Sequence, residues 1–332
     1  MQIFIPITSL LLACSLFGCR TSSGDKAAEP CGSFPEWSAE TPVKTGDVYH
    51  FRGTPYVAAG DNVGQNPIDH VALWNAVPCT YTAAAGLESQ AFLKPWKLVW
   101  SDEFEAATLD ESKWTYEVQG PGWVNHELQN YTDRRKENVR LENGQLVIEG
   151  HRDFFEGKEF SSGRIKTQGK FNWAYGHIEA RIQVPAGTGP WSAFWMMPED
   201  CSRGWPACGE IDIMEHVGYE PNTVHTTFHS LSNNWRNGKN ITASTNVDGA
   251  TSSFHIYAID WYPDRIETFV DGRRYFTSYN NGSGDDAWPF NKPYYLILNL
   301  AIGGDWGGAQ GVDRVTIWPK KMLVDYVRVY QK

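Results

Sequence analysis

Residues 210–215, with the sequence Glu-Ile-Asp-Ile-Met-Glu, place three carboxylates between apolar side chains. On a helix these acids would point in different directions, so we predict a strand, in which Glu210 and Asp212 share one face. Glu215 lies at an odd offset and joins them only if a β-bulge near positions 213–214 absorbs one residue. With this bulge the three acids line one groove, and the carboxyls of Glu210 and Glu215 could approach to ~5 to 5.5 Å, a separation at which two carboxyls can act on the same bond.

Acids that alternate with isoleucine also occur on an ordinary half-exposed strand. Three like charges on one face repel one another, however, and proteins accept that cost mainly where a shifted pKa is useful. We therefore interpret Glu210, Asp212 and Glu215 as catalytic residues.

The composition favours a large globular domain that binds carbohydrate. A chain of 332 residues with 41% hydrophobic residues can hold one large domain and a small one. Its 15 tryptophans exceed what packing demands, and exposed indoles stack on sugar rings; the alternative is a tryptophan-rich core. A formal charge of -10 argues against nucleic acid and disfavours anionic polysaccharides. We expect a neutral polysaccharide as the partner and a monomeric protein.

The amino terminus is predicted to carry an export signal. Residues 1–18 contain an apolar run too short to span a membrane and are predicted to be a signal peptide. The sequence Leu-Phe-Gly-Cys that ends at Cys19 resembles a bacterial lipobox, so Cys19 would carry a lipid and residues 19–30 would form a flexible tether. This predicts a bacterial cell-surface or outer-membrane lipoprotein that contacts the membrane through its anchor only; without lipidation the protein would be freely secreted.

Export implies an oxidising compartment, in which cysteines pair. Cys31, Cys79, Cys201 and Cys208 remain after the signal peptide and Cys19 are set aside, and they allow three pairings. Proximity in the sequence favours Cys31 with Cys79 and Cys201 with Cys208. A zinc site is disfavoured because the cysteines lie far apart and lack a C-x-x-C spacing.

The segment 31–79 is short, aromatic and interrupted by Gly and Pro, with small strands expected around residues 46–49 and 53–58. Because a segment this short buries little apolar surface, we expect the Cys31–Cys79 disulfide to stabilise it. Trp37, residues 45–48, 52–53 and 56–58, and Trp74 together resemble the carbohydrate-binding modules of families 5 and 12; the alternative is a structural spacer. Residues 80–95 are predicted to be a linker.

The remainder, residues 96–332, is predicted to be an all-β domain. Apolar runs separated by Gly, Asn, Asp and Pro turns predict many strands, and we find no long amphipathic helix. The expected strands include 145–149, 177–184, 254–261, 265–270, 294–300 and 322–331. This spacing indicates a β-sandwich of the jelly-roll type.

The motif at 209–215 resembles the active-site signature of glycoside hydrolase family 16 in its bulged form. Similar flanking motifs extend over the whole domain, at 99–104, 125–132, 162–164, 191–196 and 298–304. They are most similar to laminarinases, endo-acting hydrolases of β-1,3-glucan. The resemblance implies that Glu210 is the nucleophile, Glu215 the acid/base and Asp212 the residue that holds the nucleophile, with no cofactor for catalysis.

The resemblance also implies roles for other residues. Asn125, Glu127 and Arg164 would bind sugar hydroxyls or else brace loops, and His229 would contact the sugar or the acid/base, although His225 and His229 could also form a metal pair. Trp191, Trp195, Trp205 and Trp306 would line sugar subsites, or lie in the core. Glu103 and Asp325 resemble parts of a structural calcium site, which suits oxygen ligands.

Three hypotheses follow. The first is a retaining endo-β-1,3-glucanase that acts on laminarin-like polysaccharide. The second keeps this mechanism but acts on mixed-linkage β-1,3-1,4-glucan or on an algal galactan such as agarose, because loops set the specificity. The third is a non-catalytic glycan-binding surface protein, which would not require two opposed acids.

Overall fold

The computed structural model describes residues 96–314 and 318–332, together with six short stretches, 37–40, 42–44, 48–51, 54–58, 63–65 and 74–76. The predicted signal peptide, the lipidation site Cys19, the Cys31–Cys79 pairing and the linker lie outside the described residues.

The amino-terminal part contains a three-stranded antiparallel sheet of β1 (Val48–Phe51), β2 (Thr54–Ala58) and β3 (Trp74–Ala76). The first two strands lie where the sequence predicts them. Val43 and Ala58 are buried and pack with Trp37, Tyr49 and Tyr56 in a small apolar cluster.

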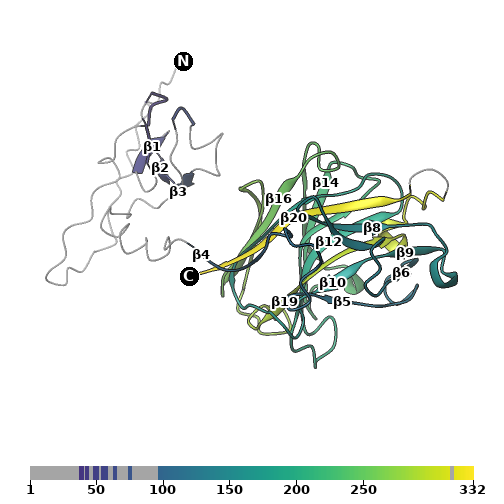
Figure 1. The fold of residues 1–332 in the computed structure, drawn as a ribbon. Coiled ribbons are helices and arrows are strands. Elements are labelled where there is room, and N and C mark those ends of the chain that lie inside the picture. The colour runs from purple at the N-terminus through teal and green to yellow at the C-terminus, as the bar shows by residue number, and fades with distance from the viewer. Residues whose placement is uncertain are drawn as a thin grey trace, which may run out of the picture.

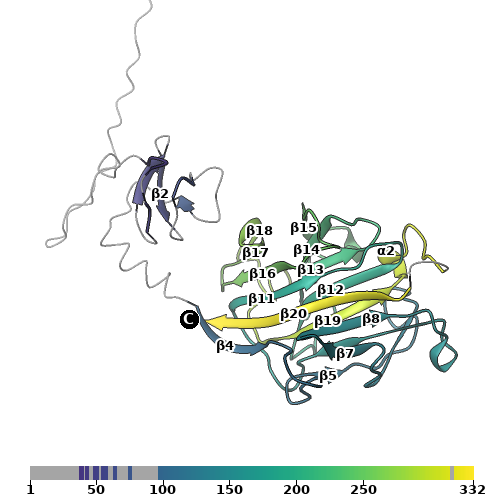
Figure 2. The same cartoon turned by 45° about the horizontal axis from the view of Figure 1, so that its top comes forward.

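Two large antiparallel sheets form the sandwich that the sequence predicts (Figure 1 and Figure 2). The first sheet has seven strands in the order β15 (Ile241–Asn246), β14 (Thr223–His229), β13 (Glu210–Val217), β12 (Pro190–Pro198), β19 (Tyr294–Ile302), β10 (Arg164–Lys166) and β5 (Thr115–Tyr116). The second has eight, namely β18 (Arg273–Tyr279), β17 (Arg265–Val270), β16 (His255–Trp261), β11 (Gly176–Gln183), β20 (Lys320–Gln331), β8 (Gln145–Gly150) and β7 (Val139–Glu142) in this order, with β4 (Lys97–Asp102) also paired to β20.

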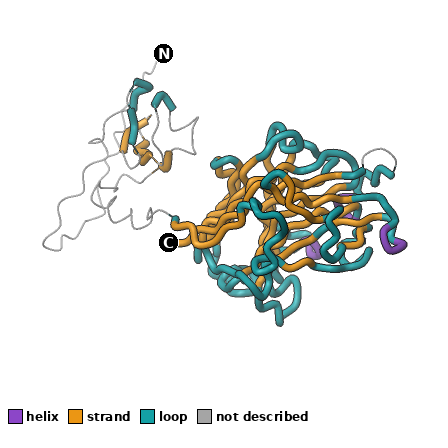
Figure 3. Tube along the Cα trace, in the orientation of Figure 1, coloured by secondary structure: helices purple, strands orange, loops and turns teal. Residues whose placement is uncertain are grey.

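Helix is nearly absent from this domain (Figure 3). The short parallel pair of β6 (Gln129–Tyr131) and β9 (Phe160–Ser162) lies beside the sheets, and α2 (Gly304–Gly307) is a single turn. In the described part of the chain no helix has the length and apolarity needed to cross a bilayer. The all-β fold class is confirmed.

The core lies between the two sheets and results from alternation along the strands. On β14, Val224 and Phe228 are buried against the second sheet, while His225 and His229 point to the opposite face. Each fully buried apolar side chain of this size contributes roughly 1.5–3 kcal/mol. The outward face of the seven-stranded sheet is thereby left for polar and aromatic residues.

The predicted β-bulge is present in β13. Asp212 pairs with Trp195 of β12 and Met214 with Phe194, so that Ile213 has no partner. The register with β14 shifts between Asp212 and Glu215. Ile213 and Met214 are both buried in the core, which returns Glu215 to the face of Glu210 and Asp212. The odd offset of Glu215 in the sequence is thus resolved as expected.

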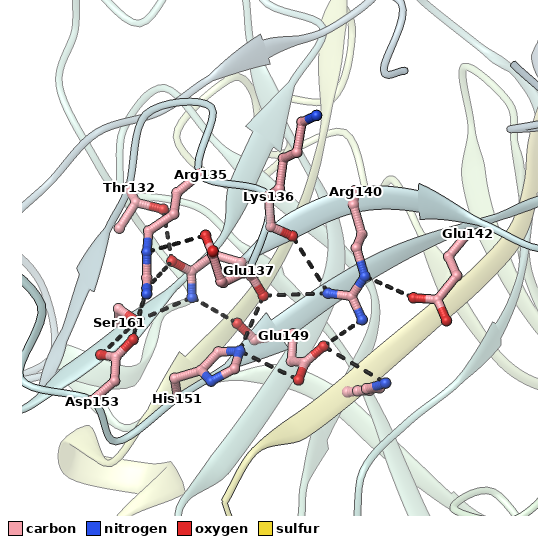
Figure 4. Close-up of polar contacts among 12 residues, drawn as sticks. Thr132, Arg135, Lys136, Glu137, Arg140, Glu142, Glu149, His151, Asp153 and Ser161 are labelled. Carbon is pink, nitrogen blue, oxygen red and sulfur yellow. Dashed lines mark hydrogen bonds and ion pairs between the residues drawn. The ribbon is translucent and has the colours of Figure 1, made fainter. Parts of the chain in front are cut away.

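A polar network holds the segment that follows β6 (Figure 4). Arg135 forms an ion pair with Asp153 at 2.8 Å, and Arg140 forms one with the buried Glu149 at 2.6 Å. Asn138 donates to the carbonyl of Glu149 at 2.9 Å. Buried charges are stabilised only when such partners surround them. The network fixes the chain next to β6, which carries residues beneath the cleft described below.

The Cys201–Cys208 disulfide is present, with an S–S distance of 2.05 Å, as the sequence predicts. It closes a loop between β12 and β13 whose ends are 7 residues apart in the chain. Trp205 lies inside this loop and faces the cleft near Glu210. The disulfide therefore links the stability of the fold to the position of an aromatic residue of the cleft.

We predict that replacing both cysteines, Cys201→Ser and Cys208→Ser, lowers the free energy of unfolding by about 2–3 kcal/mol, because a loop of this length is released in the unfolded chain. Substrate binding weakens as well, because Trp205 loses its support. Urea unfolding and KM measured on one preparation check both effects. Ser202→Ala, inside the same loop, is the control and should change neither; an equal loss in the control would contradict the prediction.

Candidate active site

A cleft of about 390 Å³ lies on the outward face of the seven-stranded sheet. Strands β10, β12, β13, β14, β15 and β19, the loop before β6 and the turn α2 all contribute to it. A second hollow of similar size adjoins it and shares Arg164, Trp195 and Glu210 with it. The two hollows together form a groove longer than one sugar ring needs.

Glu210, Asp212 and Glu215 lie side by side in this groove, and their proximity shifts their pKa values. Burial raises the pKa of all three carboxyls. The charge of Glu215 raises the pKa of Glu210 further, and both glutamates raise that of Asp212. Three like charges in a poorly solvated groove cannot all persist, so protons stay on part of the cluster at neutral pH.

The surroundings favour charge on Glu210 rather than on Asp212. Against the effects of burial and of Glu215, the nearby indole of Trp205, the charge of Arg164 and the acid proton of Asp212 each lower the pKa of Glu210. For Asp212 every neighbour raises the pKa, including its hydrogen bond to Glu210. A protonated Asp212 thus stabilises an ionised Glu210, the form that a nucleophile needs.

The pKa of Glu215 is raised mainly by burial. After burial, the strongest influence is the indole N–H of Trp191, which donates to Oε1 at 3.0 Å and lowers the pKa, while Glu127 raises it. Glu215 retains a raised pKa, as a general acid requires near neutral pH.

His229 lies against the same acids in its neutral form. Its Nε2 is 3.4 Å from Asp212 Oδ2 and 3.7 Å from Glu210 Oε1. Burial lowers the pKa of His229 to about 4. It therefore offers a neutral polar group at the end of the cluster without adding a positive charge.

Glu127 is the centre of a buried network beneath the groove. It accepts from Gln129 at 2.7 Å, Asn125 at 3.3 Å and Tyr131 at 3.5 Å, and burial raises its pKa. Tyr131 in turn accepts from Asn299, and Asn299 accepts from the indole N–H of Trp195 at 2.7 Å. This chain of hydrogen bonds fixes the orientation of Trp195 at the surface of the groove.

Two arginines and four indoles border the groove on the side of Glu210. Arg164 lies over the rings of Trp123 and Trp195, at 5.1 and 4.8 Å from their centroids. Arg236 lies over Trp205 and Trp235, at 4.6 and 5.3 Å. Trp123 and Trp235 are exposed. Flat rings held in this way present surfaces on which sugars stack.

The structure brings all residues that were predicted to be catalytic or to bind substrate to the groove. The first hollow contains the three acids and Asn125, Glu127, Arg164, Trp191, Trp195, His229 and Trp306, and the second adds Trp205. Sequence reasoning missed the lining residues Trp123, Trp235, Asn240, Thr242, Asn299 and Asp305. The large number of tryptophans in the sequence indicated that residues such as Trp123 and Trp235 could bind sugar. It did not indicate which loops fold over the sheet.

The cation sites considered from the sequence are not supported. In the described ranges, the one group of three or more metal-ligating side chains is Glu210, Asp212 and His229, with ligand atoms within 4.8 Å of one another, and His225 is not part of it. These carboxyls are two of the three that the sequence predicts to be catalytic.

The residues expected to bind calcium do not fit the ion. Glu103 accepts from Arg328 at 2.8 and 3.1 Å, and Asp325 accepts from Arg181 at 2.7 Å. Calcium requires six to eight oxygen ligands, whereas each of these two carboxylates is neutralised by its own arginine.

A jelly-roll sandwich with paired acids in an aromatic groove defines a carbohydrate-active hydrolase. The sequence profile described as glycosyl hydrolases family 16 matches residues 125–328. The chain belongs to this family.

Individual relatives agree with this assignment. A β-glucanase of Rhodothermus marinus is 46% identical over 245 residues, covering 71% of this chain and 85% of the relative. The X-ray structure of the laminarinase from Rhodothermus marinus matches with a TM-score of 0.69 at 46% identity, covering 71% and 97% of the two chains. The structure of SCLam, a non-specific endo-β-1,3(4)-glucanase, matches with a TM-score of 0.68 at 47% identity, covering 71% and 91%.

We predict that Asp212→Asn reduces kcat/KM by about tenfold and Asp212→Ala by about a hundredfold or more. The amide still donates to Glu210, whereas alanine removes the donor, so the pKa of Glu210 rises. Because Glu210 must be ionised to attack, the acidic limb of the pH profile moves to higher pH in the alanine variant and stays nearly in place in the asparagine variant. Initial rates on a soluble glucan between pH 4 and pH 9 check this. An acidic limb at the same pH in both variants would contradict the prediction.

Proposed function

We propose that this protein is a retaining endo-β-1,3-glucanase that cleaves laminarin-like polysaccharide. The observation that carries the proposal is the bulged strand β13, which places Glu210 and Glu215 on one face of the groove. Two carboxyls that can act on the same bond, one as a carboxylate and one as an acid, are the requirement of double displacement at an anomeric carbon.

The first step forms a glycosyl–enzyme ester. The carboxylate of Glu210 attacks the anomeric carbon while the carboxylic acid of Glu215 transfers its proton to the glycosidic oxygen, and the bond between that carbon and oxygen breaks. In the second step Glu215, now ionised, takes a proton from water; the water oxygen attacks the anomeric carbon and Glu210 leaves as a carboxylate. Two inversions give net retention of configuration.

The charges of the groove support this change of role. The charge of Glu215 raises the pKa of Glu210, and because repulsion between two charges is mutual, a charge on Glu210 disfavours ionisation of Glu215. When Glu210 becomes a neutral ester, this repulsion disappears and the pKa of Glu215 falls. Glu215 is then more readily ionised, which is the form that the second step requires of a base. Asp212 holds Glu210 before attack, and its proton remains available when the ester breaks.

The groove supports internal cleavage of a neutral polymer. The two adjoining hollows extend past Glu210 toward Trp205 and Trp235, where indole faces are available for further sugar units. Arg164, the main cation near the acids, is neutralised by Glu117, so the groove carries little uncompensated positive charge at that point. This arrangement suits uncharged glucose units.

A second candidate keeps the chemistry and changes the polymer. The 47% identity to a structure described as a non-specific endo-β-1,3(4)-glucanase favours activity on mixed-linkage glucan as well. Loops that border the groove decide this preference, and an algal galactan such as agarose stays an alternative for the same reason. A pure glycan-binding role is disfavoured, because binding alone does not need Glu210 and Glu215 together.

The export signal suggests where the enzyme works. Residues 1–18 and Cys19 support a lipoprotein of the bacterial surface or outer membrane, and a secreted enzyme is the alternative. We expect mass spectrometry of the mature amino terminus to find a lipid-modified Cys19. Cys19→Ser is the control and should release the protein into the medium; an unmodified mature terminus after a different residue would contradict the anchor.

Release of reducing sugar from a panel of polymers tests the function. We expect the highest kcat/KM on laminarin, a lower value on mixed-linkage β-glucan and none on agarose, with oligosaccharides of several lengths as early products. Activity on agarose without activity on laminarin would contradict the glucanase proposal, and no activity on any polymer would favour a binding protein.

The matched variants Glu210→Gln and Glu215→Gln are the controls for this panel. Each keeps the size of the side chain and removes the charge or the acid proton, so we expect kcat to fall by roughly a thousandfold or more with the fold unchanged. Circular dichroism confirms the fold. Either variant keeping most of its activity would remove that residue from the mechanism.

A further inference from the structure

Trp191 contacts the acid/base Glu215 directly rather than only lining the groove. Its indole N–H donates to Glu215 Oε1 at 3.0 Å. An indole nitrogen can donate a hydrogen bond but cannot accept one. Oε1 is therefore the accepting oxygen in both protonation states of Glu215, and the acid proton is left on Oε2. The hydrogen bond thus determines which oxygen transfers the proton.

The indole of Trp191 is held from several sides. Its ring meets that of Trp306 edge-on at 5.5 Å, and the ring of Trp306 meets that of His225 edge-on at 4.9 Å. His225 is fixed in turn by Glu220, 3.1 Å away. A Cβ at Gly307 would lie 2.8 Å from the Cβ of Trp191, so even the backbone beside it is closely packed. Because the Trp191 indole cannot reorient, its N–H fixes the orientation of the Glu215 carboxyl that accepts from it.

We infer that Trp191 is a positioning residue of the reaction, which fixes the rotamer of Glu215 and directs its protonated oxygen toward the glycosidic bond. The inference rests on the proposed role of Glu215 as acid/base. It also assigns Trp306 and His225 a function as supports of that donor rather than as sugar contacts alone.

The hydrogen bond has an electrostatic consequence as well. It favours the ionised form of Glu215, while the buried Glu127 on the loop before β6 favours the protonated form. The other titratable or charged groups that line the same cleft are Glu210 and Asp212 on β13, His225 and His229 on β14, Arg164 on β10 and Asp305 in α2. Trp191 and Glu127 therefore act on Glu215 in opposite directions.

The test compares variants whose effects on the pH profile differ in sign. Trp191→Phe keeps an aromatic ring and removes the donor, so the basic limb of kcat/KM on laminarin should move up by about one pH unit. We expect kcat to fall by roughly tenfold because the proton is less well directed, with KM changed by less than about threefold. Glu127→Gln should move the same limb to lower pH.

Trp195→Phe is the matched control. Trp195 lies on the same strand and in the same groove, but its N–H donates to Asn299 instead of a carboxyl. Its substitution should leave the basic limb in place, whatever it does to KM. A basic limb that does not move in Trp191→Phe, or that moves equally in Trp195→Phe, overturns the inference and leaves Trp191 as a wall of the sugar site.

Two further measurements keep the inference testable if Trp191→Phe folds poorly. In the unaltered protein labelled with ¹⁵N-tryptophan, one indole N–H resonance should titrate with Glu215 and stop titrating in Glu215→Gln; no such resonance overturns the inference. The proposed function is tested separately with Glu215→Ala, which should lose laminarin hydrolysis yet still cleave a dinitrophenyl β-laminaribioside, whose leaving group needs no acid. If Glu215→Ala retains laminarin hydrolysis, it is the proposed function that fails.

Discussion

The bulge in β13 is the constraint on which the site depends. One unpaired residue, Ile213, reverses the face of the sheet to which each later side chain of β13 points. As a result, Glu215 lies on the same side as Glu210 and Asp212. Because both residues of the bulge are buried between the sheets, their packing holds the acids above them in place. One face of this short segment therefore packs in the hydrophobic core, and the other carries the three acids of the groove.

Burial and repulsion then determine how the acids share protons. Burial and Glu215 raise the pKa of Glu210, but Trp205, Arg164 and Asp212 act against this rise, whereas no neighbour lowers the pKa of Asp212. Asp212 therefore holds its proton more strongly than Glu210 does. Glu215 is balanced between an indole donor and the buried Glu127. Residues that line the groove, such as Trp191 and Glu127, therefore also influence the pKa values of the acids.

The sequence predicts those features that follow from local periodicity. The strands at 265–270, 294–300 and 322–331 appear as β17, β19 and β20 with ends within two residues, and the odd offset of Glu215 was sufficient to predict the bulge. Features that depend on contacts between distant segments were not predictable. Trp123 and Trp235 reach the groove only through loop folding, and the arginines that neutralise Glu103 and Asp325 come from separate strands.

The position of the unpaired residue also bears on how such a strand can change length. Side chains on a strand repeat every two residues, and Ile213 is the residue without a partner in the ladder with β12. Without it, the three acids would be spaced evenly at every second position and would all still face the groove. The same groove is thus compatible with a strand one residue shorter, so the gain or loss of this residue need not pass through an ancestor whose acids were divided between the two faces.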